Sequence, residues 1–123
     1  KRGAIASSVA HDSHNIIAVG VDDASLCRAV NMIVEHRGGI ALVDSSNEAI
    51  LPLPVAGIMS NDDGWSVARR YAEMDRLAKN LGSPLHSPFM TLSFMALSVI
   101  PRLKLTDRGL FDGEQFAFVN LFV

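Results

Sequence analysis

The fold is decided by residues 16–23, which read Ile-Ile-Ala-Val-Gly-Val-Asp-Asp. A short run that is almost entirely apolar predicts a β-strand, and a strand without polar alternation is typical of one covered on both faces. Either of the two aspartates can cap a helix, because a carboxylate accepts hydrogen bonds from the free N–H groups of a first helical turn. A covered strand that leads into a helix predicts a helical layer over a sheet.

The residues before this stretch predict a partner strand. Ala4 to Ala10 is a second strand candidate, and the polar residues 11–15 between the two strands indicate a hairpin loop. After the aspartates, Leu26, Val30 and Ile33 fall at helical spacing with Cys27 and Val34 beside them, and this stripe is the expected core face. Gly38-Gly39 is expected to end the helix, because glycine accepts left-handed geometry at no steric cost.

The middle of the chain predicts another strand pair. Ile40 to Val43 and Ala49 to Leu53 flank residues 44–48, which are rich in turn formers. Pro52 and Pro54 cannot donate hydrogen bonds to a neighbouring strand. They therefore imply a sheet edge or the exit of a strand.

Two more helices and late strands are expected further on. Asn61 is a candidate cap with Asp62 and Asp63 in the first turn, and Gly82 is the expected stop. The apolar stripe of this helix consists of Val67, Tyr71, Met74, Ala78 and Leu81. Phe89 to Ile100 favours a buried helix ended by Pro101, although periodicity alone leaves a strand open. Leu103 to Leu105 and residues 116–123 are late strand candidates.

This order of elements predicts an α+β fold, a mixed α/β layered arrangement of two β-hairpin-like strand pairs with helices covering one sheet. The 123 residues contain no internal linker, so a single domain over 1–123 is expected.

Composition excludes several classes of function. The 11 basic and 13 acidic residues form no long run of either sign, which argues against nucleic acid and membrane surfaces as partners. Cys27 is the only cysteine, so an intrachain disulfide and a cysteine-based zinc cluster are excluded. No apolar run approaches the roughly 20 residues of a spanning helix. We expect a soluble, cytoplasmic protein, and the start at Lys1 rather than methionine suggests a fragment of a larger chain.

The loop His11, Asp12, Ser13, His14 and Asn15 is the best candidate for chemistry. Imidazole titrates near neutral pH and ligates metals, so the loop could bind a metal, move a proton or hydrogen-bond a purine edge. The alternative is a plain turn, which needs Asp, Ser and Asn for its own geometry. A self-contained metal site is disfavoured, because neighbouring residues in one loop rarely supply three or four convergent donors. His36 and His86 are distant along the chain.

Known catalytic signatures are missing. The small zinc deaminases pair His-x-Glu with Pro-Cys-x-x-Cys, and neither half is present. Ser13 and Asp12 adjoin His14, but adjacent residues rarely form a triad, and no Gly-x-Ser-x-Gly elbow or phosphate-binding loop occurs. Phe89 to Met95 could line a purine pocket, although such residues are more often core. Asp107-Arg108-Gly109 could be a turn with an ion pair.

Four ordered blocks nevertheless resemble the C-terminal domain of bacterial adenine deaminases. They are Ser8 to Ile16, Leu51 to Ser60, Pro88 to Phe94 and Leu103 to Leu110. The first block is the most specific, since core packing does not dictate its polar residues. Ser98 departs from the family pattern, in which a proline often precedes Val99-Ile100-Pro101.

The resemblance implies an accessory part of an enzyme that hydrolyses adenine to hypoxanthine and ammonia in purine salvage. In that family the metal and the proton-transfer carboxylates belong to an amidohydrolase-type barrel domain, which is absent here. No catalytic residue and no metal ligand is therefore assigned to this chain. Manganese, iron or zinc is expected in the barrel, and the expected partners are that barrel, adenine and a second copy in a homo-oligomer. The expected role of His11 to Asn15 is to face the barrel mouth, where the loop would orient substrate or exclude water.

Two alternatives stay open beside this interpretation. The domain could be a non-catalytic interaction or oligomerisation module, which predicts an exposed apolar patch. It could also be a free-standing small-molecule binding domain, which needs a pocket formed within these residues.

Overall fold

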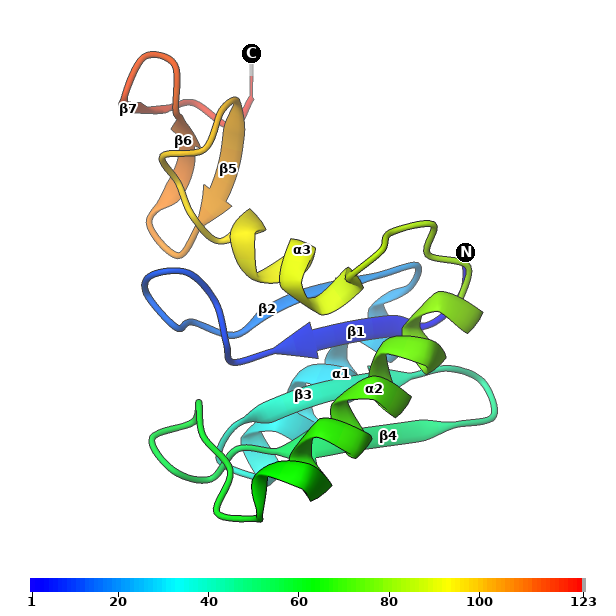
Figure 1. The fold of residues 1–123 in the computed structure, drawn as a ribbon. Helices are drawn as coiled ribbons and strands as arrows, with labels where there is room; N and C mark the ends of the chain where they lie inside the picture. Colours follow the sequence, from blue (N-terminus) through cyan, green and yellow to red (C-terminus); the bar gives the residue numbers. More distant parts are fainter. Residues whose placement is uncertain (123) are drawn as a thin grey trace.

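The computed structural model describes residues 1–122 and has two antiparallel sheets with three helices (Figure 1). The elements are β1 (Ala4–Ser7), β2 (Ile17–Gly20), α1 (Asp23–Glu35), β3 (Gly39–Val43), β4 (Glu48–Pro52), α2 (Gly64–Asn80), α3 (Pro88–Met95), β5 (Leu103–Thr106), β6 (Gly109–Asp112) and β7 (Ala117–Val119). The larger sheet has the strand order β2-β1-β3-β4, and the smaller has β5-β6-β7. The predicted α+β class and both predicted strand pairs are confirmed.

The larger sheet forms the middle layer of the body. Helix α1 packs on one face, and α2 and α3 pack on the other (Figure 1). Ile5, Leu42 and Leu51 point towards α2 and α3, whereas Ala6 and Ala41 point towards α1. Helices therefore cover both faces of this sheet, as the alternation of side chains along a strand permits.

The expectation that residues 16–21 form a strand covered on both faces is wrong. Strand β2 is an edge strand, and Val19 and Val21 are 53% and 58% exposed. The strands covered on both faces are β1 and β3, in which every residue is buried. The apolar content of a segment indicates that its side chains favour burial. It does not determine whether the strand lies inside the sheet or at its edge.

Helix α1 begins as predicted and ends differently. Asp22 is its N-cap and accepts a 2.8 Å hydrogen bond from the Ser25 N–H. Cys27 and Val34, expected beside the core face, are exposed, and the buried residues of the helix are Ala29, Met32 and Ile33. Of the predicted core face only Ile33 is fully buried, while Leu26 and Val30 are partly buried at its border.

The first residue with positive φ after α1 is Arg37, at 59°, and the glycine pair follows it. The Gly38 N–H donates to Ile33 O at 2.9 Å and the Arg37 N–H to Val34 O at 3.1 Å, which closes the helix end. Gly38 itself has φ 126°, and a Cβ added there would lie 2.4 Å from the Cα of Gly57. The glycine pair is therefore required by close backbone packing as well as by its own conformation.

Helix α2 is capped by Asp63 and not by Asn61. The Asp63 carboxylate accepts hydrogen bonds from the N–H groups of Trp65 and Ser66, both at 3.1 Å. Asp62 and Asp63 therefore precede the helix instead of lying in its first turn. The predicted stripe is confirmed, with Met74, Ala78 and Leu81 buried and Val67 and Tyr71 packed at its border. The predicted stop at Gly82 is confirmed, with φ 99°.

Helix α3 is shorter than predicted. It ends at Met95, where the N–H groups of Ala96 and Leu97 bond to carbonyls three residues back and tighten the chain into turns. Pro101 therefore does not terminate the helix, and the strand alternative for residues 89–100 is wrong.

The smaller sheet projects from the layered body (Figure 1). Strand β5 confirms the candidate at Leu103 to Leu105, and β7 confirms only residues 117–119 of the candidate at 116–123. Strand β6 is an addition that the sequence does not predict. Phe111 packs edge-to-face against Phe116 and Phe118, with ring centroids 5.4 and 5.3 Å apart. This aromatic cluster connects β6 with β7 and the residue before it, although Phe116 and Phe118 remain exposed. Residue 123 lies outside the described residues. Within residues 1–122, no helix has the combined length and apolar character that crossing a membrane requires.

Candidate functional site

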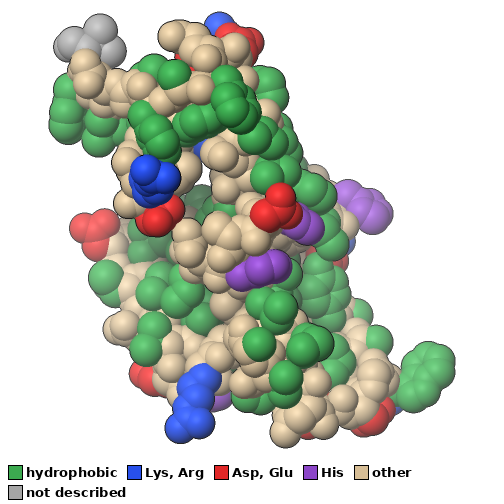
Figure 2. All heavy atoms as spheres, turned by 90° about the vertical axis from the view of Figure 1, so that its left-hand side faces the viewer, with side chains coloured by type: hydrophobic (Ala, Val, Ile, Leu, Met, Phe, Trp, Pro, Cys, Tyr) green, Lys and Arg blue, Asp and Glu red, His purple; other side chains and the backbone are tan. Residues whose placement is uncertain are grey.

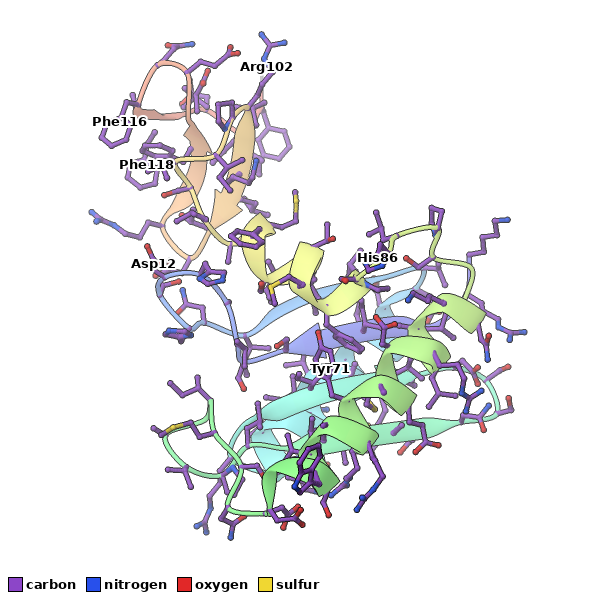
Figure 3. The ribbon with its side chains drawn as sticks, viewed as in Figure 1. Asp12, Tyr71, His86, Arg102, Phe116 and Phe118 are labelled. Atoms are coloured by element: carbon purple, nitrogen blue, oxygen red, sulfur yellow. The ribbon has the colours of Figure 1, made fainter. Side chains whose placement is uncertain are left out.

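The polar loop predicted as the site joins β1 to β2 at one end of the larger sheet. Asp12, Ser13, His14 and Asn15 are exposed, and His11 is partly buried. Figure 3 shows Asp12 on this loop beneath the smaller sheet, with His86 far from it near the start of α3. The sequence prediction of an exposed hairpin loop is confirmed.

The base of the loop is fixed by Ser8. Its hydroxyl accepts a 2.9 Å hydrogen bond from the Gly39 N–H and donates one of 2.5 Å to the carbonyl of Gly57. Ser8 is 6% exposed, so these bonds satisfy a polar group that would otherwise be buried at a cost. They connect the loop to the turn at residues 55–59, in which Val55 and Met59 exchange two backbone hydrogen bonds.

His11 is held by α3. Its N–H donates to the carbonyl of Ser93 at 3.1 Å, and its ring stacks on Phe94 with centroids 4.6 Å apart and planes 24° from parallel. Its Nδ1 lies 3.7 Å from a carboxylate oxygen of Asp12. The imidazole is therefore oriented by an aromatic face and faces a neighbouring carboxylate.

The outer part of the loop is connected to the smaller sheet. Asn15 Nδ2 donates to Asp107 Oδ1 at 3.4 Å, and Asp107 lies in the turn between β5 and β6. Asp107 and Arg108 form the predicted turn, whereas Gly109 is the first residue of β6. In place of an ion pair between them, Arg108 lies over the ring of Phe118 at 5.4 Å and Asp107 contacts Asn15. His14 has φ 51°, and its N–H donates to Ala10 O at 2.8 Å.

All four sequence blocks therefore meet at this loop. Ser8 contacts the second block through Gly57, His11 contacts the third through Ser93 and Phe94, and Asn15 contacts the fourth through Asp107. Figure 2 shows histidine side chains at the middle of this face, with the apolar side chains of the smaller sheet above them. The loop therefore presents two imidazoles, a carboxylate and an amide, and contacts with the other three blocks hold it in place.

The described residues do not provide a metal site. Within residues 1–122, no group of three or more His, Cys, Asp or Glu side chains is arranged to hold an ion. His36 Nδ1 lies 2.8 Å from Met32 O at the end of α1, and His86 Nδ1 lies 3.1 Å from Ser87 Oγ. Neither histidine joins the loop. The exposed groups of the loop are donors and acceptors for hydrogen bonds.

The sequence did not single out Phe94 as a partner of the loop. The segment Phe89 to Met95 had been interpreted as either core or pocket lining, and the structure divides it. Phe89, Leu92 and Ser93 are buried, whereas Met90, Phe94 and Met95 are 50%, 42% and 48% exposed. Helical periodicity alone could not separate these faces, because both carry apolar side chains.

The chain is similar to known proteins over a range that includes all four blocks. The model of the adenine deaminase C-terminal domain family matches residues 1–117. Adenine deaminase of Sulfurovum sp. strain NBC37-1 is 60% identical over 98% of this chain, and the match covers 23% of that protein. Adenine deaminase of Methanosarcina barkeri is 59% identical over 99% of this chain, and that of Archaeoglobus fulgidus 55% over 98%, in each case covering 22% of the relative.

The chain thus spans less than a quarter of the length of these curated relatives. The family match and a sequence identity above 50% over nearly the whole chain show that the chain belongs to the adenine deaminase C-terminal domain family.

Proposed function

We propose that this chain is the accessory C-terminal domain of a longer adenine deaminase, an enzyme that hydrolyses adenine to hypoxanthine and ammonia in cytoplasmic purine salvage. The observation that carries the proposal is the 55–60% identity to three proteins named adenine deaminase, over 98–99% of this chain. The match covers only 22–23% of each relative, which supports our proposal that the catalytic machinery lies in polypeptide outside this domain.

The proposal assigns the metal to the upstream domain. Manganese, iron or zinc would be held there and would lower the pKa of a bound water, so that hydroxide forms near neutral pH.

In this proposal the loop His11–Asn15 faces the active site. Asp12, Ser13, His14 and Asn15 are exposed polar groups, and His11 is oriented by the Phe94 ring. Covering such groups with another domain is costly unless they gain hydrogen-bond partners. The purine edge, which offers both donors and acceptors, is a suitable partner for imidazole and amide groups. The loop's role would be to orient adenine and to exclude water.

The test uses the full-length protein with its metal. His11→Ala and His14→Ala are expected to lower kcat/KM for adenine at least about tenfold, the loss that removing an orienting hydrogen bond of about 1.4 kcal/mol produces. Metal content is expected to stay unchanged. His86→Ala is the matched control, since His86 is exposed and lies away from the loop. Wild-type turnover of adenine that both loop variants retain would show that the loop is only a turn.

A second candidate is an oligomerisation module. Exposed apolar side chains on and after the smaller sheet favour it, with Leu105, Phe116 and Phe122 exposed by 69%, 70% and 84%. It predicts that Phe116→Ser reduces the molar mass of the full-length protein in light scattering. An unchanged mass would exclude this surface as the contact between copies.

A further inference from the structure

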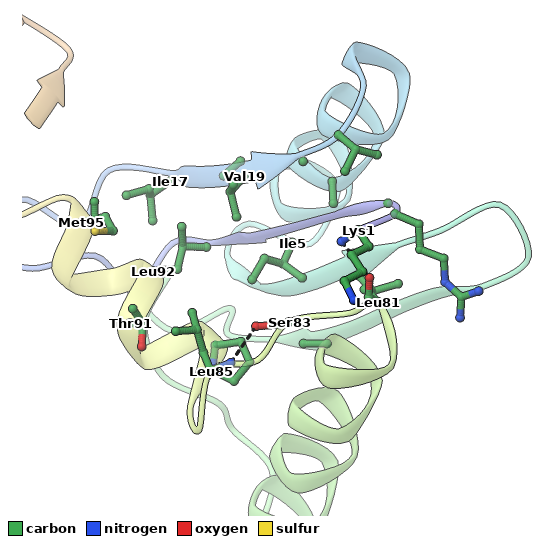
Figure 4. Close-up of a pocket in the computed structure, with 18 of the residues that line it drawn as sticks. Lys1, Ile5, Ile17, Val19, Leu81, Ser83, Leu85, Thr91, Leu92 and Met95 are labelled. Carbon is green, nitrogen blue, oxygen red and sulfur yellow. Dashed lines mark hydrogen bonds between the residues drawn. The ribbon is translucent and has the colours of Figure 1, made fainter.

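An apolar groove runs along the open edge of the larger sheet (Figure 4). We call it the edge groove and define it by Ile17, Val19, Val21, Met95, Leu103 and Leu105, which line a cavity of about 630 Å³. The first three belong to or follow β2, Met95 ends α3, and the last two belong to β5. Residues of β1, of the end of α2 and of the segment 83–85 complete the lining, so the groove is built from parts of the chain that are distant in sequence.

The side of β2 that lines the groove is only partly covered within residues 1–122, since Ile17 packs against the core cluster that contains Leu92 whereas Val19 and Val21 stay exposed. Ala18 packs towards α1, and a Cβ at Gly20 would lie 2.7 Å from Ala4 Cβ, so that side of the strand is closed. Val19 pairs with Ile5, which points towards α2 and α3, yet Val19 stays 53% exposed. An apolar strand that is covered on one side and open on the other indicates that the missing cover comes from elsewhere.

Strand β2 also offers its backbone. It lies at the end of the sheet, so within the described chain its outer edge is paired with no strand. An open edge carries free N–H and C=O groups that favour the addition of another strand. The groove thus provides apolar side chains and hydrogen-bonding groups along the same line.

The position of Lys1 indicates which polypeptide fills the edge groove. Lys1 lines the same cavity, and its backbone nitrogen lies 2.9 Å from Leu81 O, at the end of the groove next to α2. In the relatives more than three quarters of the polypeptide lies outside the matched domain, which their family places at the C-terminus. A polypeptide that precedes Lys1 is therefore covalently tethered beside the groove, which raises its effective concentration there.

We infer that the polypeptide preceding Lys1 in the full-length protein packs into the edge groove and pairs with the outer edge of β2. This rests on the part of the proposed function that makes the chain one domain of a longer protein. Val19 and Val21 are then buried in the full-length protein, and β2 becomes an inner strand.

The test measures thiol accessibility in the full-length protein. Cys27 is exposed and is replaced by serine, after which Val19→Cys is introduced in one protein and Ala72→Cys in another. Ala72 is exposed on the outer side of α2 and is the matched control. In the folded protein a maleimide is expected to modify Cys at position 19 at least about tenfold more slowly than at position 72, because reaction requires local opening. In denaturant the two rates are expected to be equal.

A benzophenone attached at position 19 then identifies the cover. Crosslinks to peptides upstream of Lys1 within the same molecule support the inference. Crosslinks between two molecules, or equal modification rates at positions 19 and 72 in the folded protein, overturn it. None of these measurements uses adenine, so a protein without deaminase activity but with a protected position 19 would refute the proposed function and keep the edge groove.

Discussion

At the scale of single residues, Ser8 connects the candidate site to the core. It lies in the same sequence block as the histidines, yet it is buried and bonded to Gly39 and Gly57, whereas the histidines are oriented outwards. The sequence identified the block as informative. It could not distinguish the residue that fixes the loop from the residues that the loop exposes, because both kinds are short and polar.

Ser8→Ala is expected to destabilise the isolated domain by about 1–3 kcal/mol, the cost of leaving buried backbone groups without a partner. Ser13→Ala, at an exposed position of the same loop, is the control and is expected to leave stability unchanged within about 0.5 kcal/mol. Urea titrations followed by circular dichroism measure both. Equal midpoints for the two variants would contradict a structural role for Ser8.

At the scale of elements, the helix caps decide where helices begin. The sequence offered Asn61 as the cap of α2, and the structure uses Asp63. Both residue types are good caps, so their chemistry could not separate them. Tertiary packing decides between the two caps, because it sets the rotation of the helix that buries Met74 and Ala78 against the sheet.

Asp63→Ala is therefore expected to lower the melting temperature of the domain by a few degrees, because the N–H groups of Trp65 and Ser66 lose their acceptor. Asn61→Ala is expected to leave it unchanged. Differential scanning calorimetry compares the two variants. A larger shift for Asn61→Ala than for Asp63→Ala would restore the cap that the sequence suggested.

Caps and turns also predict a dependence of stability on pH. Four aspartates have a lowered pKa, and in each the largest cause is a hydrogen bond from a residue two or three positions further along the chain: Asp22, Asp44, Asp63 and Asp112. Because the unfolded chain binds these protons more tightly, with a pKa of about 3.9, stability rises with pH in this range. The contribution is fully present above about pH 4 and is lost as the pH falls towards the folded values.

The measurement is the unfolding midpoint in urea, followed from neutral pH down through about pH 4. The midpoint is expected to be flat at first and then to decline. Asp63→Asn keeps a capping side chain but removes one titrating group, so its decline should be shallower. A variant curve parallel to that of the parent throughout would contradict the contribution of Asp63.

At the scale of the whole molecule, the two sheets have separate roles. Neither buried cluster of the body extends beyond Leu92 along the chain, and neither includes a residue of β5, β6 or β7. The smaller sheet instead contacts the loop through Asp107 and forms one wall of the edge groove with Leu103 and Leu105. The smaller sheet thus contributes to the surface around the loop and to the edge groove, and it adds little to the buried core.

A chain that ends at Ala96 is therefore expected to keep cooperative unfolding and the near-ultraviolet dichroism of Tyr71, which packs against Phe89 in the body. Amides of residues 11–15 are expected to exchange faster in it, because Asn15 loses Asp107. Hydrogen exchange with mass spectrometry reports both effects. Loss of cooperative unfolding would show that the smaller sheet is part of the core.

The sequence by itself determined the order of most elements, the α+β class, the helix at Asp22, the edge strand ended by prolines and the polar loop at residues 11–15. These are local properties, set by periodicity, caps and turn chemistry over a few neighbouring residues. Only the tertiary structure decided that β2 is an edge, that Asp63 and not Asn61 caps α2, and that Phe94 lies under His11. The physical reason is that strand position, helix rotation and side-chain stacking depend on contacts between residues far apart in the chain, which no local pattern encodes.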